Sequence, residues 1–84
     1  MVKFELTAHA QTVAQARAIE AEWIASTLAN PELHLPDRDD TELMHALARI
    51  PALENRVLRV VYNATTKPVR VVTVFFDRTM RDKL

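Results

Sequence analysis

A histidine and an arginine near the start of the chain could act together in acid–base chemistry. His9 precedes Arg17 by eight positions in an alanine-rich segment of helix-forming residues. In a helix the two side chains would lie roughly 80° apart around the axis and about 12 Å apart along it, with Val13 joining them into one ridge. A histidine beside a cation can give or take a proton near neutral pH. The alternative is structural: His9 packs near the helix start and Arg17 pairs with Glu20 or an acidic loop.

A second set of cations, in the C-terminal part of the chain, could bind phosphate. Cleavage of RNA needs a base for the ribose 2′-hydroxyl, an acid for the leaving oxygen and cations for the charge that builds on phosphorus. The planar guanidinium group of arginine suits the last task. The arginines concerned are Arg49, Arg56, Arg59, Arg78 and Arg81. They could equally pair with carboxylates of the same molecule or with an acidic partner.

Charge is divided unevenly along a chain whose formal net charge is zero. Residues 1–48 carry three basic and eight acidic side chains, whereas residues 49–84 carry eight basic and three acidic ones. The second part therefore has a net charge of +5 and a positive field that attracts phosphate, nucleic acid or an acidic partner. DNA binding is the weaker of these expectations, because no helical segment carries clustered Arg, Lys or Asn.

Several chemistries lack the residues they need. The chain contains no cysteine and no glycine, which excludes disulfides, thiolate nucleophiles and a glycine-rich phosphate loop. Ser26 is the only serine and lies in no nucleophile motif. His34 and His45 flank an acidic run at 37–40, but no two histidines have the i, i+4 spacing of a helical metal site. We therefore expect a solvated acidic turn, no metal and no cofactor.

Length and the N-terminal sequence indicate one small cytoplasmic domain. A chain of 84 residues forms a single domain, 1–84, with a modest core that only a partner or a second copy could reinforce. Met-Val-Lys-Phe-Glu-Leu at the start is charged and alternating, unlike a signal peptide. No apolar run approaches the ~20 residues that a membrane helix needs, so we expect no contact with membranes.

The N-terminal part of the chain predicts a short strand followed by helix. Apolar residues alternate at 2–6, which suits a half-buried strand. Thr7 is suited to cap a helical segment at 8–29, one helix or two, that ends at Asn30-Pro31. Because the chain lacks glycine, positions of positive φ are expected at Asn30, Asn55 and Asn63.

Two C-terminal segments predict an antiparallel hairpin. Residues 56–62 and 69–76 are rich in β-branched and aromatic residues, and a short link joins them. Alternation assigns to the core face Leu58, Val60, Val72, Val74 and Phe76. The other face would present Arg59 and Thr73 among Val61, Val71 and Phe75. That face is apolar for a solvated surface, so we expect it to meet a partner, a second copy or a ligand.

Residues 42–50 are ambiguous. The run Leu43-Met44-His45-Ala46-Leu47-Ala48-Arg49 is good helix material by propensity. Its aliphatic residues would also supply both faces of a strand. Pro51 ends the element in either case.

The order and spacing of several fragments resemble a known family. The opening fragments are Leu6-Thr7-Ala8-His9-Ala10, Arg17 eight residues after the histidine, Ile19, and Asn30-Pro31-Glu32. The closing ones are Val57-Leu58-Arg59-Val60-Val61 and Val71-Val72-Thr73-Val74-Phe75-Phe76-Asp77-Arg78. Together they resemble a widespread prokaryotic family of short BrnT/RelE-like toxin-related proteins, which is catalogued only as a domain of unknown function.

The resemblance implies an α+β fold in which two N-terminal helices pack on a twisted antiparallel sheet of about four strands. It also makes residues 42–50 a strand. The chain departs from the family pattern at Val13, where the family often has arginine, and at Ala18, where it often has glycine. An alanine in the left-handed conformation would cost about 1 kcal/mol; otherwise the two helices run together.

The function that the resemblance implies is that of a toxin of a toxin–antitoxin pair, a metal-independent endoribonuclease acting on messenger RNA, or a degenerate relative. Position by position, His9 and Arg17 match the family's helix motif, and Arg59 and Thr73 match its sheet positions. We expect His9, Arg59 and Thr73 to be catalytic. The residues expected to bind RNA phosphate are Arg17, Arg49, Arg56, Arg78 and Arg81.

The expected partners are RNA, an antitoxin protein and a second copy of the chain in a homodimer. The alternative function is a non-catalytic interaction module that forms a homodimer or binds an antitoxin through the apolar face of the hairpin.

Overall fold

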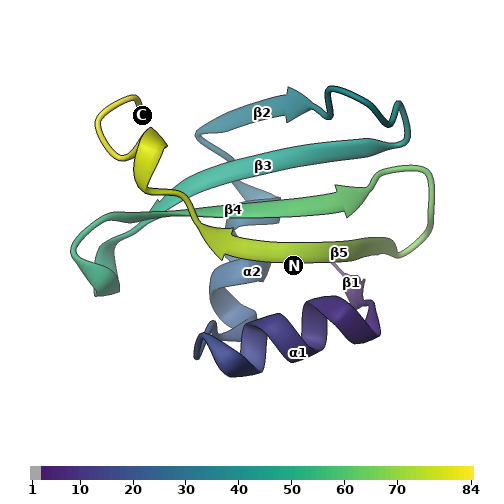
Figure 1. Ribbon diagram of the computed structural model, residues 1–84, viewed down its shortest axis with the longest axis horizontal. Coiled ribbons are helices and arrows are strands. Elements are labelled where there is room, and N and C mark those ends of the chain that lie inside the picture. Colours follow the sequence, from purple (N-terminus) through teal and green to yellow (C-terminus); the bar gives the residue numbers. More distant parts are fainter. Residues whose placement is uncertain (1–2) are drawn as a thin grey trace.

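The computed structural model describes residues 3–84, so Val2 of the predicted first strand lies outside the described residues. The helices α1 and α2 cover one face of a five-stranded sheet, and no α-helix of the described residues lies on the other face (Figure 1). The α+β class expected from the sequence is confirmed. In chain order the elements are β1 (Phe4–Leu6), α1 (Ala8–Ala16), α2 (Ala21–Ala29), β2 (Leu33–Pro36), β3 (Leu43–Ile50), η1 (Pro51–Leu53), β4 (Arg56–Asn63), β5 (Val69–Phe76) and η2 (Arg78–Met80).

The sheet is mixed, with the strand order β1-β5-β4-β3-β2. The central strands β3, β4 and β5 form antiparallel neighbours, as the predicted hairpin requires. The expectation of about four antiparallel strands is wrong in two respects. The short β1 pairs with β5 in parallel, with Phe4 opposite Val69, because the two helices carry the chain back across the sheet. The extended residues after Pro31 add β2 along β3 as a fifth strand.

Residues 43–50 form a strand, as the family resemblance implies and against their helix propensity. β3 is paired on both sides. It pairs with β4 over all eight residues and with β2 over residues 44–47. Helix propensities of ordinary residues differ by only a few tenths of a kcal/mol each. Pairing along both edges therefore outweighs the local preference.

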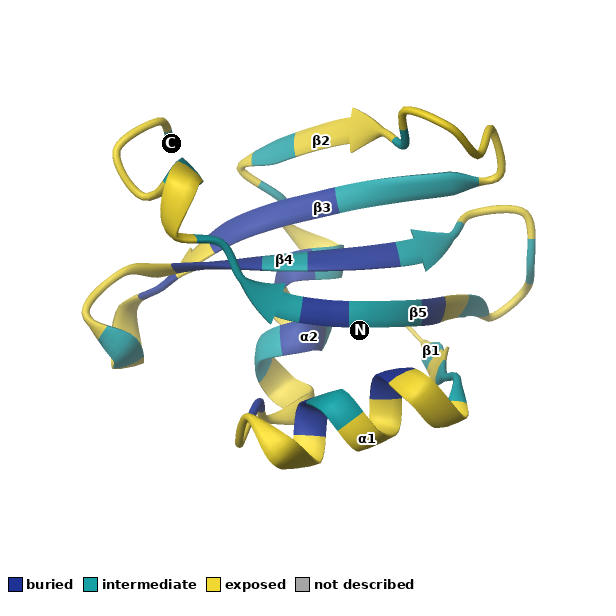
Figure 2. Ribbon diagram, viewed as in Figure 1, coloured by how far each residue is buried: buried dark blue, intermediate teal, exposed yellow. Residues whose placement is uncertain are grey.

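The core lies between the helices and the sheet. Leu58, Val60 and Val74 are fully buried there, as predicted, and Phe76 packs against them. Val71 takes the position predicted for Val72. The reason is a β-bulge: Val61 faces Thr73 while Tyr62 faces Val71, which leaves the intervening residue without a partner and reverses the alternation. Figure 2 shows the buried residues concentrated in β3, β4 and β5 and on the inner sides of both helices.

The N-terminal segment contains two helices. The side chain of Thr7 caps α1 by accepting a hydrogen bond from the backbone N–H of Ala10, as predicted. The chain then turns at Ala18, which has a φ of 53°. In residues 3–84 the other positive φ values belong to Glu54 and Asn55, so only one of the three predicted asparagines takes this conformation. Asn30 ends α2 with a φ of −138°, because the chain continues in an extended conformation toward β2.

Substituting Ala18 by glycine should stabilise the protein. An alanine at positive φ is strained by its Cβ, whereas glycine is not, and the relief is about 1 kcal/mol. We expect the urea midpoint of A18G to rise with an unchanged m-value. The matched control is Ala16→Gly in α1, where the same exchange should destabilise by about 0.5–1 kcal/mol. Equal loss of stability in both variants would contradict the strain at residue 18.

Neither α1 nor α2 has the length and continuous apolar character that a bilayer-crossing helix requires, and no other described segment is such a helix.

Candidate functional site

The sheet face opposite the helices, called the open face below, carries the polar side chains of interest. Arg59 and Thr73 both lie on it, as the hairpin alternation predicts: Thr73 is opposite Val61 and Arg59 is opposite Phe75. The guanidinium carbon of Arg59 lies 6.0 Å from the centre of the Phe75 ring. Arg59 therefore lies beside Phe75 on the face of the sheet away from the helices.

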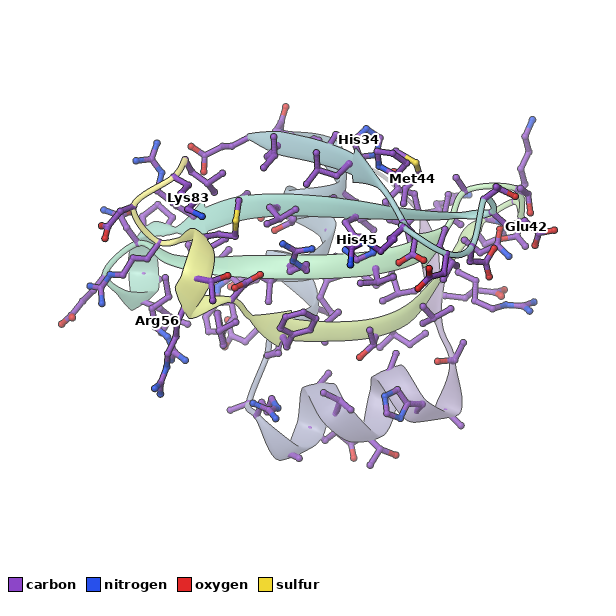
Figure 3. The ribbon with its side chains drawn as sticks, turned by 45° about the horizontal axis from the view of Figure 1, so that its top comes forward. His34, Glu42, Met44, His45, Arg56 and Lys83 are labelled. Atoms are coloured by element: carbon purple, nitrogen blue, oxygen red, sulfur yellow. The ribbon has the colours of Figure 1, made fainter. Side chains whose placement is uncertain are left out.

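Arg59 is the centre of a chain of four charged or titratable side chains, called the Asp–His–Arg network below. Its Nη1 lies 2.8 Å from Nδ1 of His45, and its Nε lies 2.9 Å from Oδ2 of Asp77. The other ring nitrogen of His45, Nε2, lies 2.6 Å from Oδ1 of Asp37. The side chains of Arg59 and His45 are each 17% exposed. Figure 3 shows His45 over the middle of the sheet.

The network fixes where the proton of His45 sits. A guanidinium group can only donate, so Nδ1 of His45 accepts from Arg59. Nε2 then carries the ring proton and donates it to the carboxylate of Asp37. His45 is thus an oriented neutral imidazole whose lone pair points at a cation. This is the arrangement of a general base whose accepting nitrogen is occupied by Arg59.

Hydrogen bonds keep both carboxylates of the network ionised. The bond from His45, followed by those from the backbone N–H groups of Asp40 and Asp39, lowers the pKa of Asp37 below its ordinary value. Burial alone would raise the pKa of Asp77, but the hydroxyl and N–H of Thr79 and the charge of Arg59 together bring it below its ordinary value. Arg59 Nε pairs with Asp77 by charge rather than through an aligned hydrogen bond.

These lowered pKa values predict a stability that depends on acid pH. A carboxyl group whose pKa falls on folding stabilises the native state above its unfolded pKa, near 3.9 for aspartate, and this contribution is lost as the pH falls through the folded value. We expect urea unfolding between pH 6 and pH 2 to show this decline. Asp37→Asn should flatten the curve, whereas Asp39→Asn, which removes an exposed carboxylate outside the network, should leave its shape unchanged. Identical curves for both variants would count against the role of Asp37.

Three of the predicted phosphate-binding arginines gather at one end of the sheet. Where β4 begins and β5 ends, a surface pocket of about 600 Å³ is lined by Glu54, Arg56, Val57, Phe76, Asp77, Arg78 and Arg81. We call it the arginine pocket. The guanidinium carbon of Arg56 lies 4.0 Å above the centre of the Phe76 ring. Asp77 lines the pocket and also pairs with Arg59, so the pocket and the Asp–His–Arg network share one residue.

The other predicted site residues lie elsewhere. His9 is exposed on α1, whose buried residues are Ala10 and Ala14, and α1 packs on the helix-covered face of the sheet. The structure therefore does not bring His9 to Arg59 or Thr73, because the sheet separates them. Arg17 is exposed at the end of α1, also on that side.

Arg49 pairs within the molecule. Its Nη2 lies 2.6 Å from Oε1 of Glu32, and its backbone N–H donates to the same carboxylate. These hydrogen bonds lower the pKa of Glu32. The alternative that the sequence left open, neutralisation of a basic residue by the acidic half, thus holds for Arg49.

His34 belongs to a separate pair near the outer edge of the sheet. Its Nε2 lies 2.6 Å from the hydroxyl of Tyr62, and the two rings are nearly parallel, with centres 6.0 Å apart. His34 is opposite Ala46 in the register and so points to the other face from His45. It takes no part in the network.

Sequence reasoning missed His45, Asp37 and Asp77 as members of a site. The signal was present in period-two alternation: read as a strand, residues 43–50 place His45 on the same face as Leu47, which pairs with Arg59. The helical propensity of the segment obscured it. Residues 3–84 contain no group of three or more His, Asp or Glu side chains that could hold a metal ion.

Comparison with known proteins identifies a family but no described relative. A family model described as a domain of unknown function (DUF4258) matches residues 6–76, which is most of the chain. No curated protein matches the chain. No solved structure matches it either.

Proposed function

We propose that this chain, which belongs to the DUF4258 family of domains of unknown function, is a small ribonuclease of the toxin type that cleaves RNA without a metal ion. The observation that carries the proposal is the Asp–His–Arg network on the open face. An oriented neutral imidazole next to a guanidinium group combines the base and the cation that RNA cleavage needs.

The chemistry follows from the positions of the protons. A phosphodiester of RNA would draw the guanidinium of Arg59 toward its oxygens, which frees Nδ1 of His45. That nitrogen would take the proton of the ribose 2′-hydroxyl while Asp37 holds the ring and stabilises the imidazolium that forms. The 2′-oxygen then bonds to phosphorus, the bond from phosphorus to the 5′-oxygen breaks, and the departing oxygen takes a proton from water. The hydroxide that remains takes the proton of the His45 imidazolium, which restores the neutral ring and the water. The products would be a 2′,3′-cyclic phosphate end and a free 5′-hydroxyl end.

Arg59 and Thr73 keep their predicted roles in this proposal, and His45 replaces His9. Arg59 would stabilise the charge that builds on phosphorus, since its Nε stays paired with Asp77 when Nη1 leaves His45 for the phosphate. Thr73 of β5 and His45 of β3 lie on the same face of the sheet, in line with each other, because Val61 of β4 is paired with both. The hydroxyl of Thr73 is suited to a hydrogen bond with a bound phosphate oxygen.

The test is cleavage of a single-stranded RNA in the presence of a metal chelator. We expect cleavage to persist in the chelator and to leave 2′,3′-cyclic phosphate ends, detected by their resistance to enzymatic tailing until the cyclic end is opened and its phosphate removed. Absence of cleavage with protein in molar excess over RNA, or ends without a cyclic phosphate, would overturn the proposal. An enzyme of this kind would act in the cytoplasm and need an antitoxin protein that covers the open face, so co-expression with such a partner should relieve its toxicity.

A second candidate function, a non-catalytic module that forms a homodimer, is favoured by the outer edge of β2. β2 pairs only with β3, and the exposed large hydrophobic side chain among the described residues is Leu35, 36% exposed on this edge strand. Edge strands with an apolar side chain readily pair with another strand. Light scattering after size exclusion would detect the dimer. A strict monomer disfavours this candidate and leaves the ribonuclease proposal standing.

A further inference from the structure

We propose that the arginine pocket binds a phosphate group of the RNA strand that flanks the cleaved bond. The inference rests on the proposed function in naming RNA, but its test measures binding and not cleavage. Three arginines from two elements, Arg56 of β4 and Arg78 and Arg81 of the C-terminal segment, surround one pocket of about 600 Å³. Guanidinium groups that converge on a hollow are the usual means of holding phosphate.

The C-terminal segment aligns two of these arginines. Residues 78–80 form the 3₁₀ helix η2, and the N–H of Arg81 continues it by donating to the carbonyl of Arg78, with 3.3 Å between the atoms. A 3₁₀ helix has three residues per turn, so side chains at i and i+3 lie one above the other. Arg78 and Arg81 therefore leave the helix in the same direction, toward the pocket that both of them line. Asp77 starts η2 by accepting from Thr79 and so fixes its direction.

Arg56 is positioned by an aromatic ring. Its guanidinium carbon lies 4.0 Å from the centre of the Phe76 ring, within the range of a cation–π interaction. Figure 3 shows Arg56 at the end of the sheet, apart from His45. Because the ring already holds the Arg56 side chain in place, a phosphate that binds there loses less free energy to the ordering of that side chain. The ring is covered by Arg56, which favours recognition of backbone phosphate over stacking of a base.

The positive charge of the pocket is only partly balanced, because three arginines line it beside Glu54 and Asp77. The ion pairs of residues 3–84 involve Arg49 and Arg59 among the arginines, and none involves Arg56, Arg78 or Arg81. Of the two carboxylates that line the pocket, Asp77 is already engaged by Arg59 and Thr79. Stacked like charges repel each other. An anion in the pocket would remove this repulsion, which is why the occupant we infer is a phosphate.

The distance to His45 indicates which phosphate it is. His45 is opposite Val61, five residues along β4 from Arg56. At about 3.3 Å per residue this is about 17 Å, and an odd number of residues also puts the side chain of Arg56 on the opposite face of β4 from Val61. The pocket lies around the end of the sheet, since it is lined by side chains of both faces. The pocket therefore lies too far from His45 to hold the phosphate that is cleaved, and it suits a phosphate farther along the same strand. Binding there should be independent of base sequence, because phosphates carry no sequence information.

The test uses the full chain and a fluorescent single-stranded RNA whose 2′-hydroxyls are methylated, so that it cannot be cleaved. Fluorescence anisotropy measures its dissociation constant at several salt concentrations. We expect the double variant R78Q/R81Q to bind at least tenfold more weakly and to reduce the slope of log K against log salt by about 0.7, since the pocket holds one phosphate and each phosphate contact on a single strand contributes about 0.7. Arg70→Gln combined with Lys67→Gln removes the same charge from residues outside the pocket and should change the dissociation constant less than twofold.

Inorganic phosphate and polyglutamate serve as competitors. Competition by phosphate at millimolar concentration that is lost in R78Q/R81Q supports a phosphate site. Equal affinity of the two double variants for the RNA overturns the inference. The inference is also overturned if polyglutamate displaces the RNA at a lower concentration of carboxylate than the concentration of phosphate required, and if this displacement is lost in R78Q/R81Q. Failure of the wild type to cleave unmodified RNA would overturn the proposed function and leave this binding result unaffected.

Discussion

Substituting His45 by alanine should lower the rate of RNA cleavage by about 10²- to 10⁴-fold, the usual contribution of a general base. The reason is specific to this side chain. His45 is the imidazole whose Nδ1 lies 2.8 Å from the guanidinium of Arg59 and whose Nε2–H is bound to Asp37. Without it the ribose 2′-hydroxyl has no acceptor beside the phosphate-binding cation. The measurement is the single-turnover rate with saturating protein, in which binding does not limit the signal.

Two other histidines make the result decisive. His34 lies on the opposite face and bonds to Tyr62, so His34→Ala should leave the cleavage rate within threefold of the wild type. His9 is the base that the sequence favours, but it is exposed on α1 behind the sheet. A loss of cleavage in His9→Ala with normal cleavage in His45→Ala would show that the open face is not the active site.

Substituting Asp77 by alanine should lower the free energy of unfolding by about 2 kcal/mol. The change leaves Arg59, only 17% exposed, without its ion-pair partner, and removes the acceptor that holds both the N–H and the hydroxyl of Thr79 at the start of η2. Loss of a helix cap costs about 1 kcal/mol, and an unpaired group in a largely buried site costs about as much again. Urea unfolding followed by circular dichroism measures the change.

Asp82→Ala is the matched control, because Asp82 is exposed near the C-terminus and takes part in no ion pair among residues 3–84. Its effect should stay within about 0.5 kcal/mol. A double-mutant cycle with Arg59→Met isolates the ion pair. If Asp77→Ala costs no more than the control, the pair on the open face does not contribute to stability.

The elements with strong local signals could be predicted from the sequence. Dense β-branched residues identify β4 and β5, and Thr7 before an alanine-rich run identifies the start of α1. β3 is different, because its local propensity favours helix and only the partners on both sides make it a strand. The bulge at Val72 likewise depends on pairing, so alternation assigned Val71 and Val72 to the wrong faces.

The candidate site was predictable only in part, for the same reason. Arg59 and Thr73 belong to the hairpin, and alternation alone puts them on one face. Their contacts come from segments whose conformation the local sequence does not determine: Asp37 from the turn after β2 and His45 from β3. The pairing of His9 with Arg17 was derived from helix geometry alone, which gives the spacing within a helix but not the sheet face on which it packs.

The position of β1 beside β5 has a consequence for the order of events during synthesis. The first strand of the chain pairs with the last strand of the sheet, and α1 packs on that same strand. Neither contact exists until Phe76 has left the ribosome. The apolar side of α1 therefore stays without its binding surface until β5 has been made, and the native contacts of largest sequence separation form last. We expect a nascent chain stalled before β5 to remain sensitive to protease, and completion of β5 to make the N-terminal helices and the sheet resistant in one step.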